Sequence, residues 1–221
     1  MRLLAAFAFH APLLVPHPLP RAQATMTIPA PDAPRGVLVQ GGAMRTWSFR
    51  SPAVQRVQVV LGTSGRPLDA DIELWHGPDD TPFRTRVYAE DGRCRPSRVV
   101  LDTPHGPNTV VVRNIGQLEL PFCAVVTPEI SHSVSTDCLS SGVTIQGGAL
   151  RTYSFEPRVS SVQVLLETEG LPLNARIELL QGPDSNKQVI ELYTDDGCAR
   201  PFFATIETPG DGNVVRVINT A

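Results

Sequence analysis

The sequence predicts an all-β protein built from two tandem repeated antiparallel β-sandwich domains. Three observations lead to this fold class: a long internal repeat, short segments with apolar residues at every second position, and turns rich in Gly, Pro, Asn and Asp. No window carries the i, i+3, i+4, i+7 apolar spacing over the length that a major helix needs. We therefore expect strands throughout the folded part of the chain.

The internal repeat covers most of the chain. The phrase "QGGAMRTWSFRS" begins at Gln40, and its near-copy "QGGALRTYSFEP" begins at Gln146. Further on, "VQVVLGTSGRPLDADIELWHGPDD" aligns with "VQVLLETEGLPLNARIELLQGPDS", and "NTVVVRN" aligns with "NVVRVIN". Such a repeat indicates two copies of one folding unit, each of about 100 residues. The predicted parts of the chain are a targeting or disordered segment at 1–30, repeat 1 at 31–127, a linker at 128–141 and repeat 2 at 142–221.

The strands of repeat 1 follow from alternation and from the turns between them. The runs "VQRVQVVL", "ADIELW" and "TVVVRN" alternate as half-buried strands do, and "TSGRPLD", "HGPDD", "EDG" and "TPHGPN" read as turns. Seven or eight strands in about 100 residues favour a sandwich. Strands are expected at 36–40, 44–50, 55–62, 70–76, 84–89, 97–103, 108–114 and 117–126.

The last strand of repeat 1 has no counterpart in repeat 2. The alternating run at 117–126 follows the first repeat, whereas the second ends at Ala221, where its own last strand would begin. Either the sequence is a truncated version of a longer protein, or another segment fills the gap. An unfilled strand position exposes backbone donors and acceptors, which invites pairing with another chain.

The repeated phrase supplies the candidate site residues, which we interpret as a structural motif. Its glycines allow a tight turn, and the strand that follows places an arginine and two aromatic residues on one face. The aromatic residues are expected to anchor the core, and the arginine to pack its stem at the sheet end with its head paired to the acidic "EDG" or "DDG" loop. The motif residues are Gly41, Gly42, Arg45, Trp47 and Phe49 in repeat 1, and Gly147, Gly148, Arg151, Tyr153 and Phe155 in repeat 2.

The N-terminal segment predicts a targeting function. The first 31 residues contain no Asp or Glu, and the apolar run "LLAAFAFHAPLLV" is too short and too interrupted to span a membrane. We therefore expect this segment to lie outside the folded domains, with no transmembrane segment.

Charge and cysteine spacing exclude several kinds of site. The formal net charge is −3, with no basic stripe, so nucleic acid is not an expected partner. No C-x-x-C pair is present, and we expect free thiols at Cys94, Cys123, Cys138 and Cys198, with a Cys123–Cys138 bridge as the alternative in an oxidising compartment.

No motif indicates an enzyme, a metal or a cofactor. The chain has no G-x-S-x-G, H-E-x-x-H or P-loop pattern, so no catalytic residue is predicted. The acidic clusters "GPDD", "AEDG", "GPDS" and "TDDG" lack the spacing of a calcium loop, and turns are the preferred interpretation over a calcium site. A carbohydrate site would need exposed aromatic residues, and the few that the motif supplies are expected to be buried.

The sequence resembles a known family at "GGAMRTWSF", "GRPLDADIELWHGPD", "YAEDG" and their second copies. These residues are similar to those of the pyrenoid shell (PyShell) proteins of diatoms and related algae with secondary red plastids. The resemblance implies a structural protein that self-assembles into a homo-oligomeric lattice, a sheet enclosing the Rubisco matrix and supporting CO2 fixation. Its partners would be further copies of itself, with the Rubisco matrix or other pyrenoid proteins as candidates.

The resemblance also bears on location. The N-terminal "AAFAFHAP" is similar to the phenylalanine-containing cleavage motif of plastid-targeting signals in those algae, which implies a chloroplast location. The competing hypothesis is a secreted or lumenal tandem β-sandwich module that binds glycan or calcium. Differences between the copies mark where the two domains could acquire different partners: Arg66/Leu171, Asp71/Arg176 and His76/Gln181.

Overall fold

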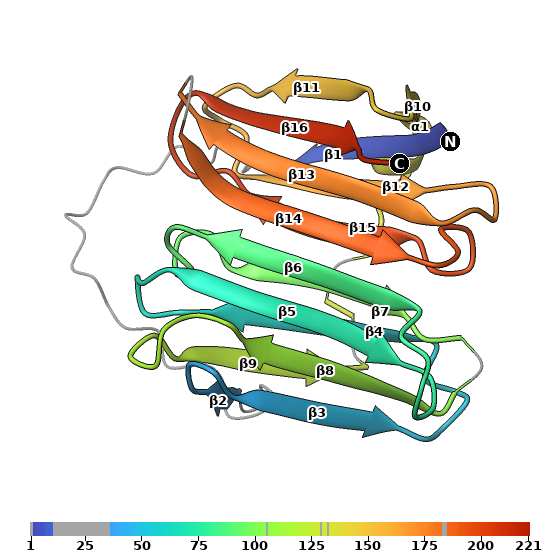
Figure 1. Ribbon diagram of the computed structural model, residues 1–221. Coiled ribbons are helices and arrows are strands. Elements are labelled where there is room, and N and C mark those ends of the chain that lie inside the picture. The colour runs from blue at the N-terminus through green and yellow to red at the C-terminus, as the bar shows by residue number, and fades with distance from the viewer. Residues whose placement is uncertain (1, 11–35, 105, 129, 132, 183–184) are drawn as a thin grey trace.

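The computed structural model describes residues 2–10, 36–104, 106–128, 130–131, 133–182 and 185–221. It confirms the predicted fold class, because the chain forms two antiparallel eight-stranded sheets that face each other across a common core (Figure 1). Sheet A has the order β10 (Val143–Gln146), β1 (Arg2–His10), β12 (Ser161–Glu167), β15 (Phe202–Glu207), β7 (Ser97–Asp102), β4 (Arg56–Gly62), β9 (Phe122–Thr127), β2 (Val37–Val39). Sheet B has the order β11 (Leu150–Ser154), β16 (Asn213–Asn219), β13 (Leu173–Gln181), β14 (Asn186–Thr194), β6 (Phe83–Ala89), β5 (Leu68–Trp75), β8 (Asn108–Asn114), β3 (Met44–Phe49).

Both sheets run without a break from one repeat into the other. In sheet B the seam is the antiparallel pair β6–β14, and in sheet A it is the shorter pair β7–β15. Phe83 of repeat 1 stacks on Phe202 of repeat 2 across the seam, with ring centroids 6.4 Å apart and ring planes 7° apart. The two repeats therefore share sheets and core instead of standing as separate sandwiches.

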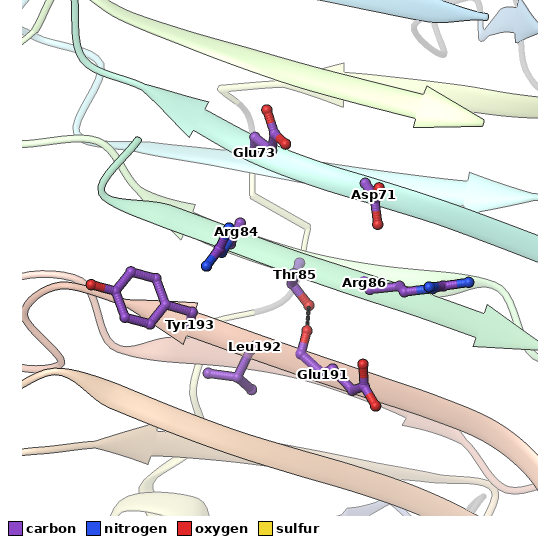
Figure 2. A pocket seen from close by; sticks show the side chains of 8 residues that line it. All are labelled: Asp71, Glu73, Arg84, Thr85, Arg86, Glu191, Leu192 and Tyr193. Carbon is purple, nitrogen blue, oxygen red and sulfur yellow. Dashed lines mark hydrogen bonds between the residues drawn. The ribbon is translucent and has the colours of Figure 1, made fainter. Parts of the chain in front are cut away.

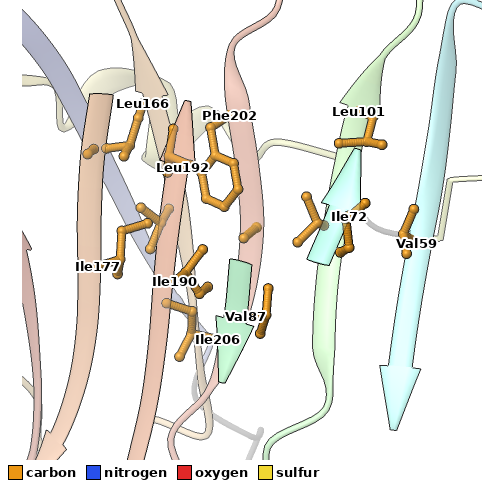
Figure 3. Close-up of a cluster of buried hydrophobic side chains, with 14 of the residues drawn as sticks. Val59, Ile72, Val87, Leu101, Leu166, Ile177, Ile190, Leu192, Phe202 and Ile206 are labelled. Carbon is orange, nitrogen blue, oxygen red and sulfur yellow. The ribbon is translucent and has the colours of Figure 1, made fainter. Parts of the chain in front are cut away.

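The core follows from the period-2 pattern of the strands. Along β5, for example, Leu68, Ala70, Ile72 and Leu74 are fully buried, while the residues between them turn outward. Figure 3 shows the continuity of this core, with Val59, Ile72, Val87 and Leu101 from repeat 1 and Leu166, Ile177, Ile190, Leu192, Phe202 and Ile206 from repeat 2.

The structure corrects the expectation that residues 1–30 contribute no folded element. Arg2–His10 form β1, which lies between β10 and β12 in sheet A. β9 lies in the equivalent place between β2 and β4 in repeat 1, so β1 fills the strand position that repeat 2 lacks. Leu3, Ala5 and Phe7 point into the main core, which explains why an apolar segment settles there.

A single short helix, α1 (Thr136–Ser140), is present among the described residues, within the linker that precedes β10. Ser135 caps it by accepting a hydrogen bond from the Cys138 amide at 3.2 Å. Cys138 packs with Ala6, Leu165 and Phe203 in a second, smaller core on the outer face of sheet A. The helix therefore covers β1 from the side opposite the main core.

Candidate functional site

The outer face of sheet B carries a row of alternating charges that crosses the seam between the repeats. Register places Arg113 opposite Asp71, Asp71 opposite Arg86, Arg86 opposite Glu191, and Glu191 opposite Arg176. We call these five residues the charge row. Figure 2 shows its centre, where Asp71, Arg86 and Glu191 project from β5, β6 and β14 toward the same surface.

The ion pairs around the charge row extend to neighbouring carboxylates. Arg86 Nη2 lies 3.2 Å from Asp69 Oδ2, and Arg176 Nε lies 2.7 Å from Glu178 Oε1 while its Nη1 contacts Glu191. Arg216 Nη1 lies 3.1 Å from Glu178 Oε2. Glu178 is buried, and its two arginine partners offset the cost of burying its charge. The more exposed Arg86–Asp69 and Arg176–Glu191 pairs each contribute about 0–1 kcal/mol.

The two repeats differ in charge at the positions that meet at the seam. Arg86 aligns with Glu191 in the repeat, and Asp71 aligns with Arg176. Because the seam joins equivalent strands in antiparallel order, residue 86 lies opposite residue 191. Two identical repeats would therefore place like charges opposite each other at this pair. The change from Arg86 in repeat 1 to Glu191 in repeat 2 places opposite charges there instead. The difference between the copies thus serves pairing within the chain.

A shallow hollow of about 320 Å³ lies over this seam. Burial raises the pKa of Asp71, with nearby Glu73 and Asp69 adding to the effect and Arg86 opposing it. The Arg84 guanidinium lies 5.3 Å from the centre of the Tyr193 ring. The surface of this hollow is mostly charged, and its lining residues are Asp71, Glu73, Arg84, Thr85, Arg86, Glu191, Leu192 and Tyr193.

The repeated motif lies at the two ends of sheet B. Met44–Phe49 and Leu150–Ser154 are its edge strands, and the aromatic residues on their inner side are half-buried against the main core: Trp47, Phe49, Tyr153 and Phe155. Tyr153 also contacts Phe7 of β1, with ring centroids 4.0 Å apart. Gly42 and Gly148 adopt φ of 74° and 71°, and both glycines of each pair, Gly41–Gly42 and Gly147–Gly148, precede the edge strand.

The motif arginines do not reach the acidic loops. Arg45 and Arg151 are exposed, and the Arg45 Nη1 donates to the neighbouring Met44 carbonyl at 3.3 Å. The loop carboxylates have other partners: Glu90 pairs with Lys187 at 2.6 Å, and Asp195 pairs with Arg200 at 3.0 Å. The expected pairing of the arginine with these loops is therefore wrong.

The acidic loops use their central carboxylates to shape turns, as the sequence favoured. Asp91 Oδ1 accepts hydrogen bonds from the Arg93 and Cys94 amides, and Asp196 Oδ1 accepts from the Cys198 and Ala199 amides. Across the described ranges, no group of three or more His, Cys, Asp or Glu could hold a metal ion. A search of those same ranges finds no helix that is both long enough and apolar enough to cross a membrane.

All four cysteines are free thiols, as the sequence favoured over the Cys123–Cys138 bridge. Cys94, Cys123 and Cys198 are exposed, while Cys138 is buried on the side of α1 that packs against sheet A. Burial raises the pKa of the Cys138 thiol to about 11, so this group stays protonated near neutral pH.

The fold and these surfaces define a tandem-repeat β-sandwich protein whose two halves share both sheets. The chain belongs to the diatom pyrenoid shell protein family, since the family's model matches residues 31–221. This membership gives the chain a structural role in the pyrenoid shell and implies a location in the pyrenoid of a plastid.

Two other comparisons add little. A comparison with curated proteins finds no match. Among solved structures, the chain is similar at 9% identity and a TM-score of 0.21 to the CBM2 module of an evolved Dit of Lactobacillus casei BL23 phage J-1, covering 85% of this chain and 76% of that one. A likeness this weak carries no argument about fold or function.

Proposed function

We propose that this protein is a structural subunit that associates with further copies of itself into a sheet enclosing the Rubisco matrix, and so supports CO2 fixation. Family membership over residues 31–221 is the observation that carries the proposal. The fold adds a physical reason: two repeats fused through both sheets make one rigid slab with similar ends. Contacts between unlike ends of such a slab do not close, and they extend into strips or layers.

The edges of the slab favour association over a monomeric state. Natural sheets protect edge strands with proline, lysine, bulges or inward charges. β3 and β11, which read "MRTWSF" and "LRTYS", each carry one exposed arginine but no proline, and Met44 and Leu150 on these strands are also exposed. The glycan- or calcium-binding alternative gains no comparable observation, because the central carboxylates of two acidic loops are bonded to their own backbone.

The test is assembly of the purified full chain. Negative-stain electron microscopy over a range of protein concentrations should show sheets, tubes or strips above a threshold concentration. A fluorescent fusion should form a layer around Rubisco in the plastid. Monodisperse particles at every concentration, together with a diffuse fusion, would contradict the proposal.

A further inference from the structure

The two ends of the seam between the repeats can be compared directly, because the internal repeat relates them. β6 and β14 are equivalent strands that run antiparallel, so Phe83 lies opposite Thr194 at one end of the pair and Gln188 lies opposite Ala89 at the other. In the repeat, Gln188 is the counterpart of Phe83, and Ala89 is the counterpart of Thr194. Both positions therefore carry a smaller side chain at the Gln188 end.

The Phe83 end of the seam is filled by an aromatic pair. Phe83 of sheet B stacks on Phe202 of sheet A across the core. At the other end the equivalent places are taken by Gln188 in sheet B and Ser97 in sheet A. Ser97 begins β7, which follows β6 through the loop 90–96, so it lies at the same end of the seam as Gln188. An amide and a hydroxymethyl group thus replace two rings, which leaves space that the rings fill at the first end.

Gln188 and Ser97 are buried polar side chains without a partner. They are 1% and 0% exposed, and both face the interior between the two sheets. Within the part of the chain that the structure describes, no hydrogen bond is made by the amide nitrogen or the amide oxygen of Gln188, or by the Ser97 hydroxyl. Groups that leave water without a new partner lose their full hydration, so folded proteins rarely bury three such atoms at one place.

The arginine that crosses this end of the seam does not satisfy these atoms. Arg95, two residues before Ser97, is 7% exposed, and its Nη2 donates to Oε1 of Gln181 in repeat 2 at 3.0 Å. Its Nε has no partner among the described residues, as is also true of its counterpart Arg200. Arg95 therefore covers the end of the seam and adds a further polar atom without a partner.

We propose that the Gln188 end of the seam encloses at least one ordered water molecule that bridges Gln188 and Ser97. A buried water typically makes about three hydrogen bonds and needs a polar site with room for it. The amide and the hydroxyl offer both donors and acceptors, and a place enclosed between two sheets admits only a small molecule. The seam is then aromatic at one end and hydrated at the other. This inference goes beyond the proposed shell function and does not depend on it.

The direct test is a crystal or electron cryo-microscopy structure of the full chain at a resolution that shows ordered water. A water oxygen should lie within about 2.7–3.2 Å of the Gln188 amide and of Ser97 Oγ. A Gln188 side chain that bonds Ser97 or Arg95 directly, with no water between them, would overturn the inference. Density too large for water would also overturn it, because a solute would then occupy the place.

A second test fills the space. The double variant Ser97→Phe with Gln188→Phe copies the aromatic end, so it should displace the water and keep a urea midpoint at or above that of the wild type. The matched control is Val99→Phe with Ile190→Phe, which changes the next inward-facing residues of the same two strands. Both control positions are already packed in the main core, so overpacking should lower the midpoint. A loss in the first variant as large as in the control would show that no space exists there and would contradict the proposal.

Discussion

β9 and β1 occupy equivalent places in the two repeats, yet they come from different parts of the chain. β9 follows β8 through a short loop, while β1 precedes the whole of repeat 1 and crosses to repeat 2. Both strands face the main core with apolar side chains, such as Phe122 in β9 and Phe7 in β1. The comparison shows that this strand position in the sheet is specified by the apolar core and by the unpaired backbone of the neighbouring strands. It does not depend on which part of the chain supplies the strand.

The two strands share one type of contact and differ in another. Asn114 donates to the Val39 carbonyl at 3.0 Å, and the equivalent Asn219 donates to the Ile145 carbonyl at 3.0 Å. In repeat 1, Asn114 also donates to the Leu120 carbonyl at 2.9 Å, in the loop into β9. β1 is held by Ser141, whose hydroxyl accepts from the Phe7 amide at 2.7 Å and donates to the Phe7 carbonyl at 2.6 Å. Repeat 1 is therefore completed by a strand that is close in sequence, whereas repeat 2 is completed by a strand that is distant in sequence. Closing the longer loop costs more conformational entropy.

The largest expected effect comes from Phe7→Asp, which removes a buried ring and places a charge in the core. Loss of a buried Phe destabilises the folded state by about 3–5 kcal/mol. We expect this loss to exceed the free energy that holds β1 in sheet A, so β1 should detach while the rest of the protein stays folded. Because α1 packs on β1, release should expose Cys138. Thiol labelling of Cys138, with the other cysteines replaced by serine, should speed up well before global unfolding in urea.

The matched variant is Phe122→Asp in β9, which should lower global stability without exposing Cys138 locally. Unchanged Cys138 labelling in Phe7→Asp would contradict the dependence of repeat 2 on β1.

The second-largest expected effect is a difference in stability loss between alanine substitutions at two equivalent glycines, Gly41 and Gly147. A Cβ at Gly41 would lie 2.0 Å from the Gln117 carbonyl oxygen in the loop that leads to β9, whereas Gly147 is exposed. Gly41→Ala should therefore cost about 1–3 kcal/mol through overpacking, and Gly147→Ala should stay within about 0.5 kcal/mol. Urea denaturation measures both, and equal losses would show that the β9 loop does not distinguish the two repeats.

A smaller effect is expected at the seam. Glu191→Arg places a third positive charge between Arg86 and Arg176, and should cost about 0.5–1 kcal/mol at low salt. High salt should reduce the loss. Glu169→Arg, on an exposed loop, is the control. A loss that is the same at low and high salt would show that opposite charge is not what pairs the repeats.

The smallest expected effect is a pH dependence from Asp71. Because burial raises its pKa in the folded state above the usual 3.8, the folded protein binds this proton more tightly than the unfolded chain does. This contribution favours folding at low pH and is lost as pH rises through the folded-state pKa. Asp71→Asn should flatten that part of the stability profile above the usual pKa of 3.8, unlike Asp79→Asn at an exposed turn. Parallel urea midpoints for wild type and Asp71→Asn would rule this out.

Much of the strand pattern could be predicted from the sequence because buried residues alternate with less buried ones along several strands, such as β5, β6, β7 and β16. The run at 108–114 matches β8, and 84–89 differs from β6 by one residue. β1 was missed because both of its faces are buried, one by the main core and one by α1, so Leu3, Ala6 and Phe7 show no alternation. Two observations together could have identified β1: repeat 2 lacks its last strand, and the N-terminal segment contains an apolar run long enough to form one. β1 lies outside the range that the family model matches.

The sequence alone does not predict that both sheets continue from one repeat into the other, although a charge difference between the repeats is related to this continuity. The sequence alone predicts that the Asp71/Arg176 difference gives the two domains different partners. The structure shows that residues 71 and 176 instead flank the opposed pair Arg86 and Glu191. Period-2 patterns fix which face a residue occupies but not which strand lies beside it, so the seam required three-dimensional information.

The charge row lies on one broad surface of the slab only. The opposite surface, formed by sheet A, carries α1 and the exposed Cys123. If copies repeat in one orientation, every charge row falls on the same side of the layer. Such a layer would be chemically asymmetric through its thickness, as a biological membrane is, and could present different surfaces to the enzyme matrix and to the surrounding stroma without a second component.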